Sequence, residues 1–161
     1  MNNDKLNIAF IGIGSNEGNK IENIKSAITL INDLADCTIV KVSSLYETLP
    51  FGDVIQDNFF NAAIKISTSS NLQELFSDLK IIEQKLGRIF REKWGPREID
   101  LDILLFNDLI FSNEIITLPH KGIIYRDFVI VPLIEIEPEL IHPIYKKKMS
   151  DFVSEIKIKN I

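Results

Sequence analysis

Glu98-Ile-Asp-Leu-Asp-Ile-Leu-Leu105 carries the plainest structural signal in this chain, because apolar and acidic residues alternate along it. Alternation with a period of two is typical of a β-strand with one buried face. The side chains predicted to share the buried face are those of Ile99, Leu101, Ile103 and Leu105. Asp100 and Asp102 share the opposite face. The stretch therefore predicts a strand that packs against helices on one side and presents two carboxylates on the other.

A second stretch, Phe59-Phe-Asn-Ala-Ala-Ile-Lys-Ile66, alternates in the same way. Its apolar face is predicted to consist of Phe60, Ala62, Ile64 and Ile66, and its other face of Phe59, Asn61 and Lys65. Both strands thus have one face for helices and one polar or aromatic face. We expect a functional site on that second, open face.

The rest of the chain completes a recognisable order of elements. We predict, in sequence, a strand at 7–13, a helix at 20–34, strands at 38–46 and 59–67 that could pair, a helix at 72–86 with Asn71 as its cap and Gly87 as its stop, and a strand at 99–106. This order is typical of an α+β ferredoxin-like sandwich, an antiparallel sheet with two main helices on one face. A C-terminal extension is expected to add a hairpin at 109–117, helical turns at 126–136 interrupted at Pro132, and a short helix near Asp151.

Composition limits the classes of protein to consider. The 161 residues, 45% of them hydrophobic, suit one domain spanning 1–161. No apolar run is long enough to cross a bilayer and no secretory signal is recognisable, so we expect a cytoplasmic protein without membrane contact. The single cysteine, Cys37, is interpreted as a strand residue in a reducing compartment. A formal charge of −5 argues against nucleic-acid binding.

The strongest functional signal joins two acids to a basic segment. Carboxylates two residues apart on a strand have α-carbons about 7 Å apart and can share one or two Mg²⁺ ions. Asp100 and Asp102 alone would also be typical of a solvated strand face. The preceding segment, which contains Arg88, Arg91 and Arg97, favours instead a site for a metal-bound compact anion such as a nucleotide.

Other motifs are excluded. The segment 12–20 lacks the Lys-Ser/Thr ending of a Walker loop and does not match G-x-G-x-x-G, so we interpret it as a strand-to-helix turn organised by Ser15 or Asn16. His120, His142 and one cysteine do not make a zinc site. No setting for a nucleophilic serine occurs.

A set of ordered motifs resembles a known family. These are Gly14-Ser-Asn16, Ser43-Ser-Leu-Tyr-Glu-Thr48, Asn58-Phe-Phe-Asn-Ala-Ala63, Leu86-Gly-Arg88, Trp94-Gly-Pro-Arg-Glu-Ile-Asp-Leu-Asp-Ile103, Leu118-Pro-His120 and Val131-Pro-Leu133. Over nearly its whole length the chain resembles the 6-hydroxymethyl-7,8-dihydropterin pyrophosphokinase family of folate biosynthesis. The resemblance implies that a pterin hydroxymethyl oxygen attacks the β-phosphorus of ATP, the co-substrate, and that AMP departs.

The resemblance also implies roles for individual residues. Arg88, Arg97, Asp100 and Asp102 would be catalytic, and the two aspartates would hold Mg²⁺, two ions being expected. The expected ATP-binding residues are Glu83, Arg88, Arg97, Thr117, His120 and Arg126. The expected pterin-binding residues are Thr48, Leu49, Phe51, Phe59, Asn61, Trp94 and Phe128, with the rings of Phe59 and Phe128 on the two faces of the pterin. Loops at 48–58 and 87–96 would close over the substrates.

Some positions depart from the family pattern, and other functions stay open. Phe90 stands where a second loop arginine is common, and Arg91 could take its place. The chief alternative is a noncatalytic ligand-binding or regulatory module, since the fold hosts many functions. An RNA-binding module is disfavoured by the acidic sheet face. Ordinary phosphoryl transfer, with ADP as product, is the second enzymatic reading. The expected partners are the small-molecule substrates alone, with the chain a monomer.

Overall fold

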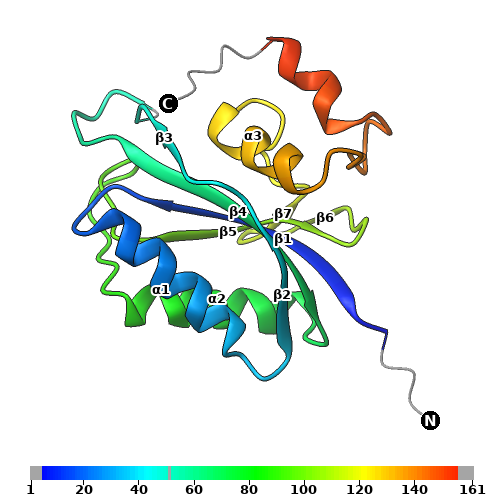
Figure 1. Ribbon diagram of the computed structural model, residues 1–161, viewed down its shortest axis with the longest axis horizontal. Helices are drawn as coiled ribbons and strands as arrows, with labels where there is room; N and C mark the ends of the chain where they lie inside the picture. The colour runs from blue at the N-terminus through cyan, green and yellow to red at the C-terminus, as the bar shows by residue number, and fades with distance from the viewer. Residues whose placement is uncertain (1–4, 51, 156–161) are drawn as a thin grey trace.

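An antiparallel sheet runs through the centre of the structure, a computed structural model that describes residues 5–50 and 52–155 (Figure 1). Its strands are β1 (Asn7–Ser15), β2 (Cys37–Val42), β3 (Tyr46–Thr48), β4 (Phe59–Thr68) and β5 (Asp100–Phe106). They lie in the order β2-β4-β1-β5, and β3 also pairs with β4. With the helices included, this arrangement confirms the predicted ferredoxin-like sandwich.

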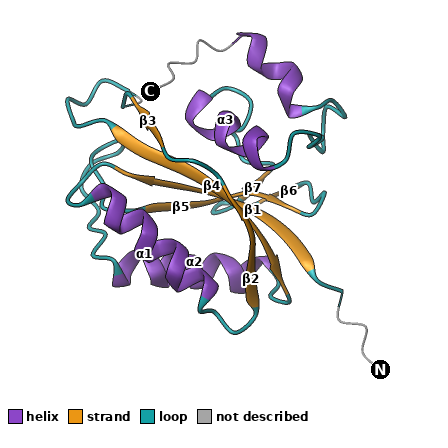
Figure 2. Ribbon diagram, viewed as in Figure 1, coloured by secondary structure: helices purple, strands orange, loops and turns teal. Residues whose placement is uncertain are grey.

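Helices α1 (Lys20–Asn32) and α2 (Leu72–Lys85) cover one face of the sheet, as expected (Figure 2). Their apolar stripes pack on the inward side chains of the four long strands. The fully buried members of this core include Ile11, Ile24, Ile64, Leu75, Leu79 and Leu101. Cys37 lies buried at the start of β2, which agrees with its interpretation as a strand residue.

Helix α2 has the predicted ends. The side chain of Asn71 accepts a hydrogen bond from the backbone N–H of Glu74, and the Glu74 carboxylate accepts one from the backbone N–H of Asn71. This capping box satisfies two N–H groups that a helix start leaves without partners. Gly87, with a φ of +85°, ends the helix in a conformation that costs glycine little.

The opposite face of the sheet is not left open, and this part of the prediction is wrong. Helix α3 (Asp127–Ile136) lies over it, and the 3₁₀ helix η1 (Met149–Glu155) packs against α3 (Figure 1). A second apolar cluster fills the interface, including Phe10, Ala63, Leu104, Ile130 and Leu133. Only the part of this face beside the first residues of α3 remains available for a site.

Pro132 lies inside α3 and does not interrupt it, contrary to expectation. A proline within a helix removes one backbone hydrogen bond. Here the turns on both sides of it are held by burial, since Val129, Ile130, Leu133 and Ile136 are all buried against the sheet. Packing of an apolar face is the main source of helix stability in proteins, and it outweighs the missing bond.

Strand β5 contains a bulge that the alternating sequence concealed. Ile11 pairs with Ile103, whereas its neighbour Phe10 pairs with Leu105, so Leu104 is an extra residue. As a result, Leu105 packs with Leu104 in the cluster under α3, and not beside Ile103 as predicted. An extra residue reverses the alternation beyond it. Asp100 and Asp102 precede the bulge and point to the α3 side.

Smaller differences concern the edges. The predicted strand 38–46 is divided into β2 and β3, because Ser43 between them bonds to Ala63 through both its backbone and its hydroxyl. The expected hairpin is present as β6 (Phe111–Ser112) and β7 (Thr117–Leu118). Across the described part of the chain, no helix combines the length and apolar character needed to span a membrane.

Candidate active site

Two hollows meet on the sheet face beside the start of α3. The first is lined by residues that include Gly12, Gly14, Thr48, Leu49, Phe59, Asn61, Arg97, Asp100 and Phe128. The second lies toward the β6–β7 hairpin and is lined by residues that include Phe76, Ile103, Glu114, Thr117, His120 and Lys121. Trp94, Asp102 and Arg126 line both. A ligand in one hollow would therefore lie directly beside a ligand in the other.

The floor of the first hollow is bare backbone. In the pairing of β1 with β5, Gly12 lies opposite Asp102 and Gly14 opposite Asp100. A Cβ atom on Gly14 would lie 2.8 Å from Oδ1 of Asn61. The absent side chain is thus what allows the Asn61 amide to lie flat against β1. The sequence indicates a turn at 12–20 and does not show that Gly12 and Gly14 lie in a strand that lines a hollow.

Aromatic side chains line the first hollow. Phe59 comes from β4 and Phe128 from α3, so its two aromatic walls belong to different layers. Nδ2 of Asn61 donates to Oγ1 of Thr48 at 2.6 Å, which leaves the remaining amide groups to face the hollow. Phe51, also expected here, lies outside the described residues.

The predicted acids and arginines are in direct contact. Oδ1 of Asp100 is 2.9 Å from Nη1 of Arg88, and Oδ2 of Asp100 is 2.7 Å from Nη1 of Arg97. The same Arg88 nitrogen is 2.8 Å from Oε1 of Glu83. Although burial opposes it, the charges of Asp100 and Glu83 raise the pKa of Arg88. Both oxygens of Asp100 are therefore occupied by guanidinium groups.

Two of the expected nucleotide ligands, Arg88 and Glu83, line neither hollow, and Glu83 is the more deeply buried of the two. It is 4% exposed, and its Oε1 accepts a hydrogen bond of 2.8 Å from the backbone N–H of Leu101. Nζ of Lys80 contacts both carboxylate oxygens. The carboxylate points into the protein, where it ties α2 to β5 and holds Arg88, and it does not line either hollow.

Asp102 stands at the boundary of the two hollows. Removal from water, and next the charge of Asp100, raise the pKa of Asp102 from 3.8 to about 7. Nε2 of His120 lies 3.8 Å from Oδ2 of Asp102, and Nδ1 of His120 accepts from the backbone N–H of Gly122. Burial and then the charge of Arg126 lower the pKa of His120. A neutral His120 thus carries its proton on the nitrogen nearer Asp102.

Arg126 lies between aromatic rings at the same boundary. Its guanidinium carbon is 5.3 Å from the ring centre of Trp94 and 5.9 Å from that of Phe128. Such stacking holds a cation in place without neutralising it. A Cβ atom on Gly122 would lie 2.7 Å from Cδ of Arg126, so this glycine leaves room for the arginine side chain.

The structure also reveals a buried residue whose importance the sequence analysis understated. Asn16 is 1% exposed, and its Oδ1 accepts from the backbone N–H of Arg97 at 2.9 Å. Its Nδ2 donates to the carbonyl of Asp57 at 2.9 Å and to Gln56 at 2.8 Å. Gln56 in turn donates to the carbonyl of Trp94 at 2.6 Å. Asn16 therefore joins the segments that border the two hollows, 49–58 and 87–97.

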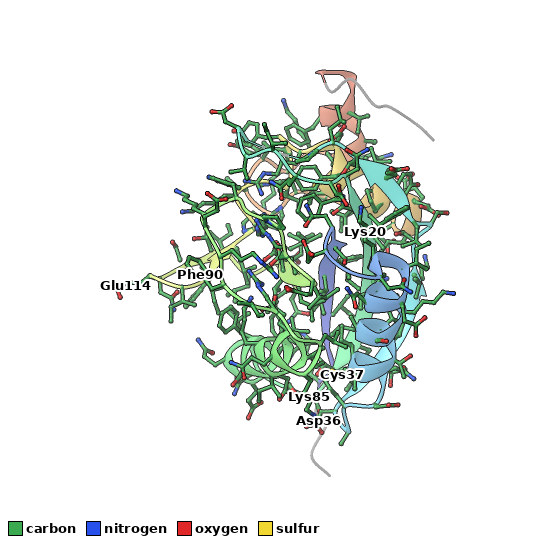
Figure 3. The ribbon with its side chains drawn as sticks, turned by 90° about the vertical axis from the view of Figure 1, so that its left-hand side faces the viewer. Lys20, Asp36, Cys37, Lys85, Phe90 and Glu114 are labelled. Atoms are coloured by element: carbon green, nitrogen blue, oxygen red, sulfur yellow. The ribbon has the colours of Figure 1, made fainter. Side chains whose placement is uncertain are left out.

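Arg91, which could take the place of the arginine absent at Phe90, lies away from both hollows in this structure. Its guanidinium pairs with Glu98 at 2.6 Å. Phe90 is 85% exposed and lies on the same side of the molecule as Glu114 of the β6–β7 turn (Figure 3). In this conformation no side chain of the segment 89–93 lines either hollow.

The donor set suits magnesium only in part. Among the described residues, no group of three or more His, Cys, Asp or Glu side chains could hold a metal ion. Asp100 and Asp102 are nevertheless hard oxygen donors on one strand face, and Mg²⁺ is commonly bound by one or two carboxylates together with substrate phosphates and water. The residues fit a magnesium ion that arrives with a phosphate ligand.

Comparison with known proteins gives consistent matches. The model of the 7,8-dihydro-6-hydroxymethylpterin-pyrophosphokinase (HPPK) family matches residues 10–138. The chain is 42% identical over 150 residues to the 2-amino-4-hydroxy-6-hydroxymethyldihydropteridine pyrophosphokinase of Aquifex aeolicus, covering 93% of this chain and 92% of that one. It is 45% identical over 130 residues to the Bacillus subtilis protein of the same name, covering 81% and 78%.

Solved structures agree on the fold. HPPK-DHPS from Plasmodium falciparum superposes with a TM-score of 0.75 at 17% identity, over 94% of this chain. This chain spans only 41% of that larger protein, so the match concerns the architecture of one part of it.

Proposed function

The chain belongs to the 7,8-dihydro-6-hydroxymethylpterin-pyrophosphokinase family, and from that premise we propose that it transfers diphosphate from ATP to 6-hydroxymethyl-7,8-dihydropterin, releasing AMP, in folate biosynthesis. The observation that carries the proposal is the shared boundary of the two hollows. Trp94, Asp102 and Arg126 line both, so a ring in one hollow and a triphosphate in the other would meet at the acid pair.

The pterin is proposed to occupy the first hollow. Phe59 and Phe128 would stack on its two ring faces, and Asn61 would bond to its amide edge. Thr48, Leu49 and Trp94 would complete the slot, with Phe51 assigned by family resemblance alone. This orientation would direct the hydroxymethyl group toward Asp102.

ATP is proposed to occupy the second hollow and to reach the acid pair with its phosphates. Thr117, His120 and Arg126 line this hollow or its boundary. Arg97 lines the first hollow and contacts Asp100, and Arg88 contacts the same carboxylate. Glu83 would act by holding Arg88. The guanidinium groups would bind the phosphate oxygens as negative charge shifts among those oxygens during transfer. Neutral His120 would donate a hydrogen bond from Nε2 to a phosphate oxygen.

The reaction exchanges one P–O bond for another. The hydroxymethyl oxygen forms a bond to the β-phosphorus, the bond from that phosphorus to the oxygen bridging it to the α-phosphate breaks, and the hydroxyl proton is released. Two Mg²⁺ ions held by Asp100 and Asp102 would withdraw negative charge from the triphosphate. The protein's own task is to align the two substrates and exclude water, without a covalent intermediate.

The decisive experiment identifies the products by mass. The protein, ATP, Mg²⁺ and 6-hydroxymethyl-7,8-dihydropterin should yield AMP and a pterin diphosphate in equal amounts. ADP and a pterin monophosphate would instead indicate ordinary phosphoryl transfer. Binding of both ligands without turnover would indicate a noncatalytic module.

The remaining expectations are proposals too. The charge of −5 supports a protein that binds small molecules and not nucleic acid. We also propose that it acts as a cytoplasmic monomer with its small-molecule substrates as its partners. Sedimentation at working concentration would test the monomer.

Gly14→Ala should weaken pterin binding selectively. The added Cβ would lie 2.8 Å from Oδ1 of Asn61, and Asn61 is tied to Thr48, so the amide must turn away from the ring edge. We expect the KM for the pterin to rise about tenfold and the KM for ATP to change little. A tenfold change corresponds to the loss of about one hydrogen bond between uncharged groups. Steady-state kinetics in both substrates would measure this. An equal rise in both KM values would contradict the assigned role of Gly14.

A further inference from the structure

The ion pairs around Asp100 bear on how a metal ion could enter the site. Both carboxylate oxygens of Asp100 are engaged, one by Arg88 at 2.9 Å and the other by Arg97 at 2.7 Å. The Asp100 side chain is 19% exposed, so water screens these contacts only partly. A cation that approaches Asp100 must displace a guanidinium group or lie beside it.

Positive groups already surround the acids of this cluster. Glu83 pairs with Lys80 and Arg88, and Asp100 pairs with Arg88 and Arg97. Asp102 lies beside His120 and lines the same boundary as Arg126. A bare divalent ion would add two positive charges next to two arginines, which is strongly unfavourable at these distances. A metal ion that comes with a triphosphate adds little net charge, and it brings oxygens to which the arginines can transfer.

The two arginines differ in how firmly they are held. Arg88 is bound by Glu83 as well as by Asp100, and that second partner is buried. The charged partner that Arg97 contacts is Asp100, while its backbone is fixed by Asn16. Arg97 is therefore the side chain best placed to exchange a carboxylate for a phosphate without movement of the main chain.

We propose that the Arg88–Asp100–Arg97 ion pairs close the metal site in the nucleotide-free protein, so that the divalent ion and the nucleotide bind together. The inference rests on the proposed function, because it takes the anion to be a nucleoside triphosphate. It adds an order of loading: the Asp100 oxygen that Arg97 contacts is open to a metal ion once Arg97 has moved to a phosphate.

Titration with Mn²⁺ alone, followed by electron paramagnetic resonance, tests the proposal. The unaltered protein should bind Mn²⁺ weakly, with a dissociation constant above about 1 mM. Arg97→Gln, which removes the competing cation, should bind Mn²⁺ about tenfold more tightly, while its affinity for a nonhydrolysable ATP analogue falls. Arg97→Lys keeps a cation at this position and should resemble the unaltered protein in the Mn²⁺ titration. The gain should vanish in the double variant Arg97→Gln/Asp102→Asn.

The outcomes separate this inference from the proposed function. Tight Mn²⁺ binding by the unaltered protein without nucleotide would overturn the inference even if the protein makes AMP, and this measurement needs no variant to fold. Equal or weaker Mn²⁺ binding by a cooperatively folded Arg97→Gln protein would overturn it as well. Failure to form AMP with ATP, Mg²⁺ and 6-hydroxymethyl-7,8-dihydropterin would overturn the proposed function and leave the Mn²⁺ result unaffected.

Discussion

Replacement of Asp102 by asparagine should lower kcat/KM by about a thousandfold or more while the fold is kept. Asp102 lines both hollows and is one of two carboxylates available for a metal ion there. Asparagine has the same shape but lacks the charge that would hold the metal against the triphosphate. Single-turnover rates with both substrates saturating would measure the loss. A rate within tenfold of the unaltered protein's would show that the acid pair is not the reaction centre.

The same substitution should make the protein more stable at alkaline pH. The folded-state pKa of Asp102 is raised from 3.8 to about 7, so between these values the folded chain binds more protons than the unfolded chain. Stability therefore falls as the pH rises through this window, because the ionised carboxylate is disfavoured beside Asp100. The asparagine side chain of the variant does not ionise. Asp102→Asn should therefore have a higher Tm than the unaltered protein at pH 8 and lose this advantage near pH 4. The difference in Tm should be moderate, because the Asp102 side chain is 41% exposed and water screens its charge.

Asn16→Ala should damage both stability and catalysis. The change leaves the backbone N–H of Arg97 and the carbonyl of Asp57 without their buried partner, which costs about 2–4 kcal/mol. For a chain of this length, Tm should fall by roughly 5–15 °C. Because Arg97 would lose its fixed position, kcat should drop about a hundredfold. Thermal unfolding and kinetics well below Tm would give the two values.

A matched control distinguishes positioning from general loosening. Asn71→Ala removes the cap of α2, far from both hollows, and should lower stability by about 1 kcal/mol with kcat unchanged. If Asn16→Ala also left kcat unchanged, the residue would be structural only, and the link between segments 49–58 and 87–97 would have no bearing on the reaction.

The parts of the fold that local patterns determine were predicted well. Alternation in 98–105 placed Asp100 and Asp102 on one face, and helical spacing with Asn71 and Gly87 located α2. These signals depend on neighbours only a few residues apart. The structure brings the acids together with Arg88, Arg97 and Arg126, as the resemblance implied, while their roles remain predictions.

Features that depend on distant pairing were missed. The hydrogen bond between Asn16 and Arg97 joins residues 81 positions apart in the sequence. The requirement for glycine at position 14 follows from the side chain of Asn61, which lies against it in the fold. The position of α3 over the second face of the sheet was not predicted. Its apolar residues indicate that the segment is buried, but its local sequence does not indicate which face of the sheet it packs against. Glu83 was assigned to the nucleotide by analogy, whereas its contacts are with Leu101, Lys80 and Arg88.

The extra residue Leu104 serves the layer above the sheet and not the acids beside it. With Ala9 paired to Phe106 and Phe10 to Leu105, the far end of β5 is fixed on β1. If Leu104 were deleted, Ile103 would still lie opposite Ile11 and Asp102 opposite Gly12, now in regular pairing, so the acids would keep their face of the sheet. The loss would be the Leu104 side chain under α3 and its carbonyl, which accepts a hydrogen bond of 3.0 Å from the backbone N–H of His120. The bulge therefore ties α3 and the segment of His120 to β5, and shortening the strand by this residue should loosen His120 while the acid pair stays in place.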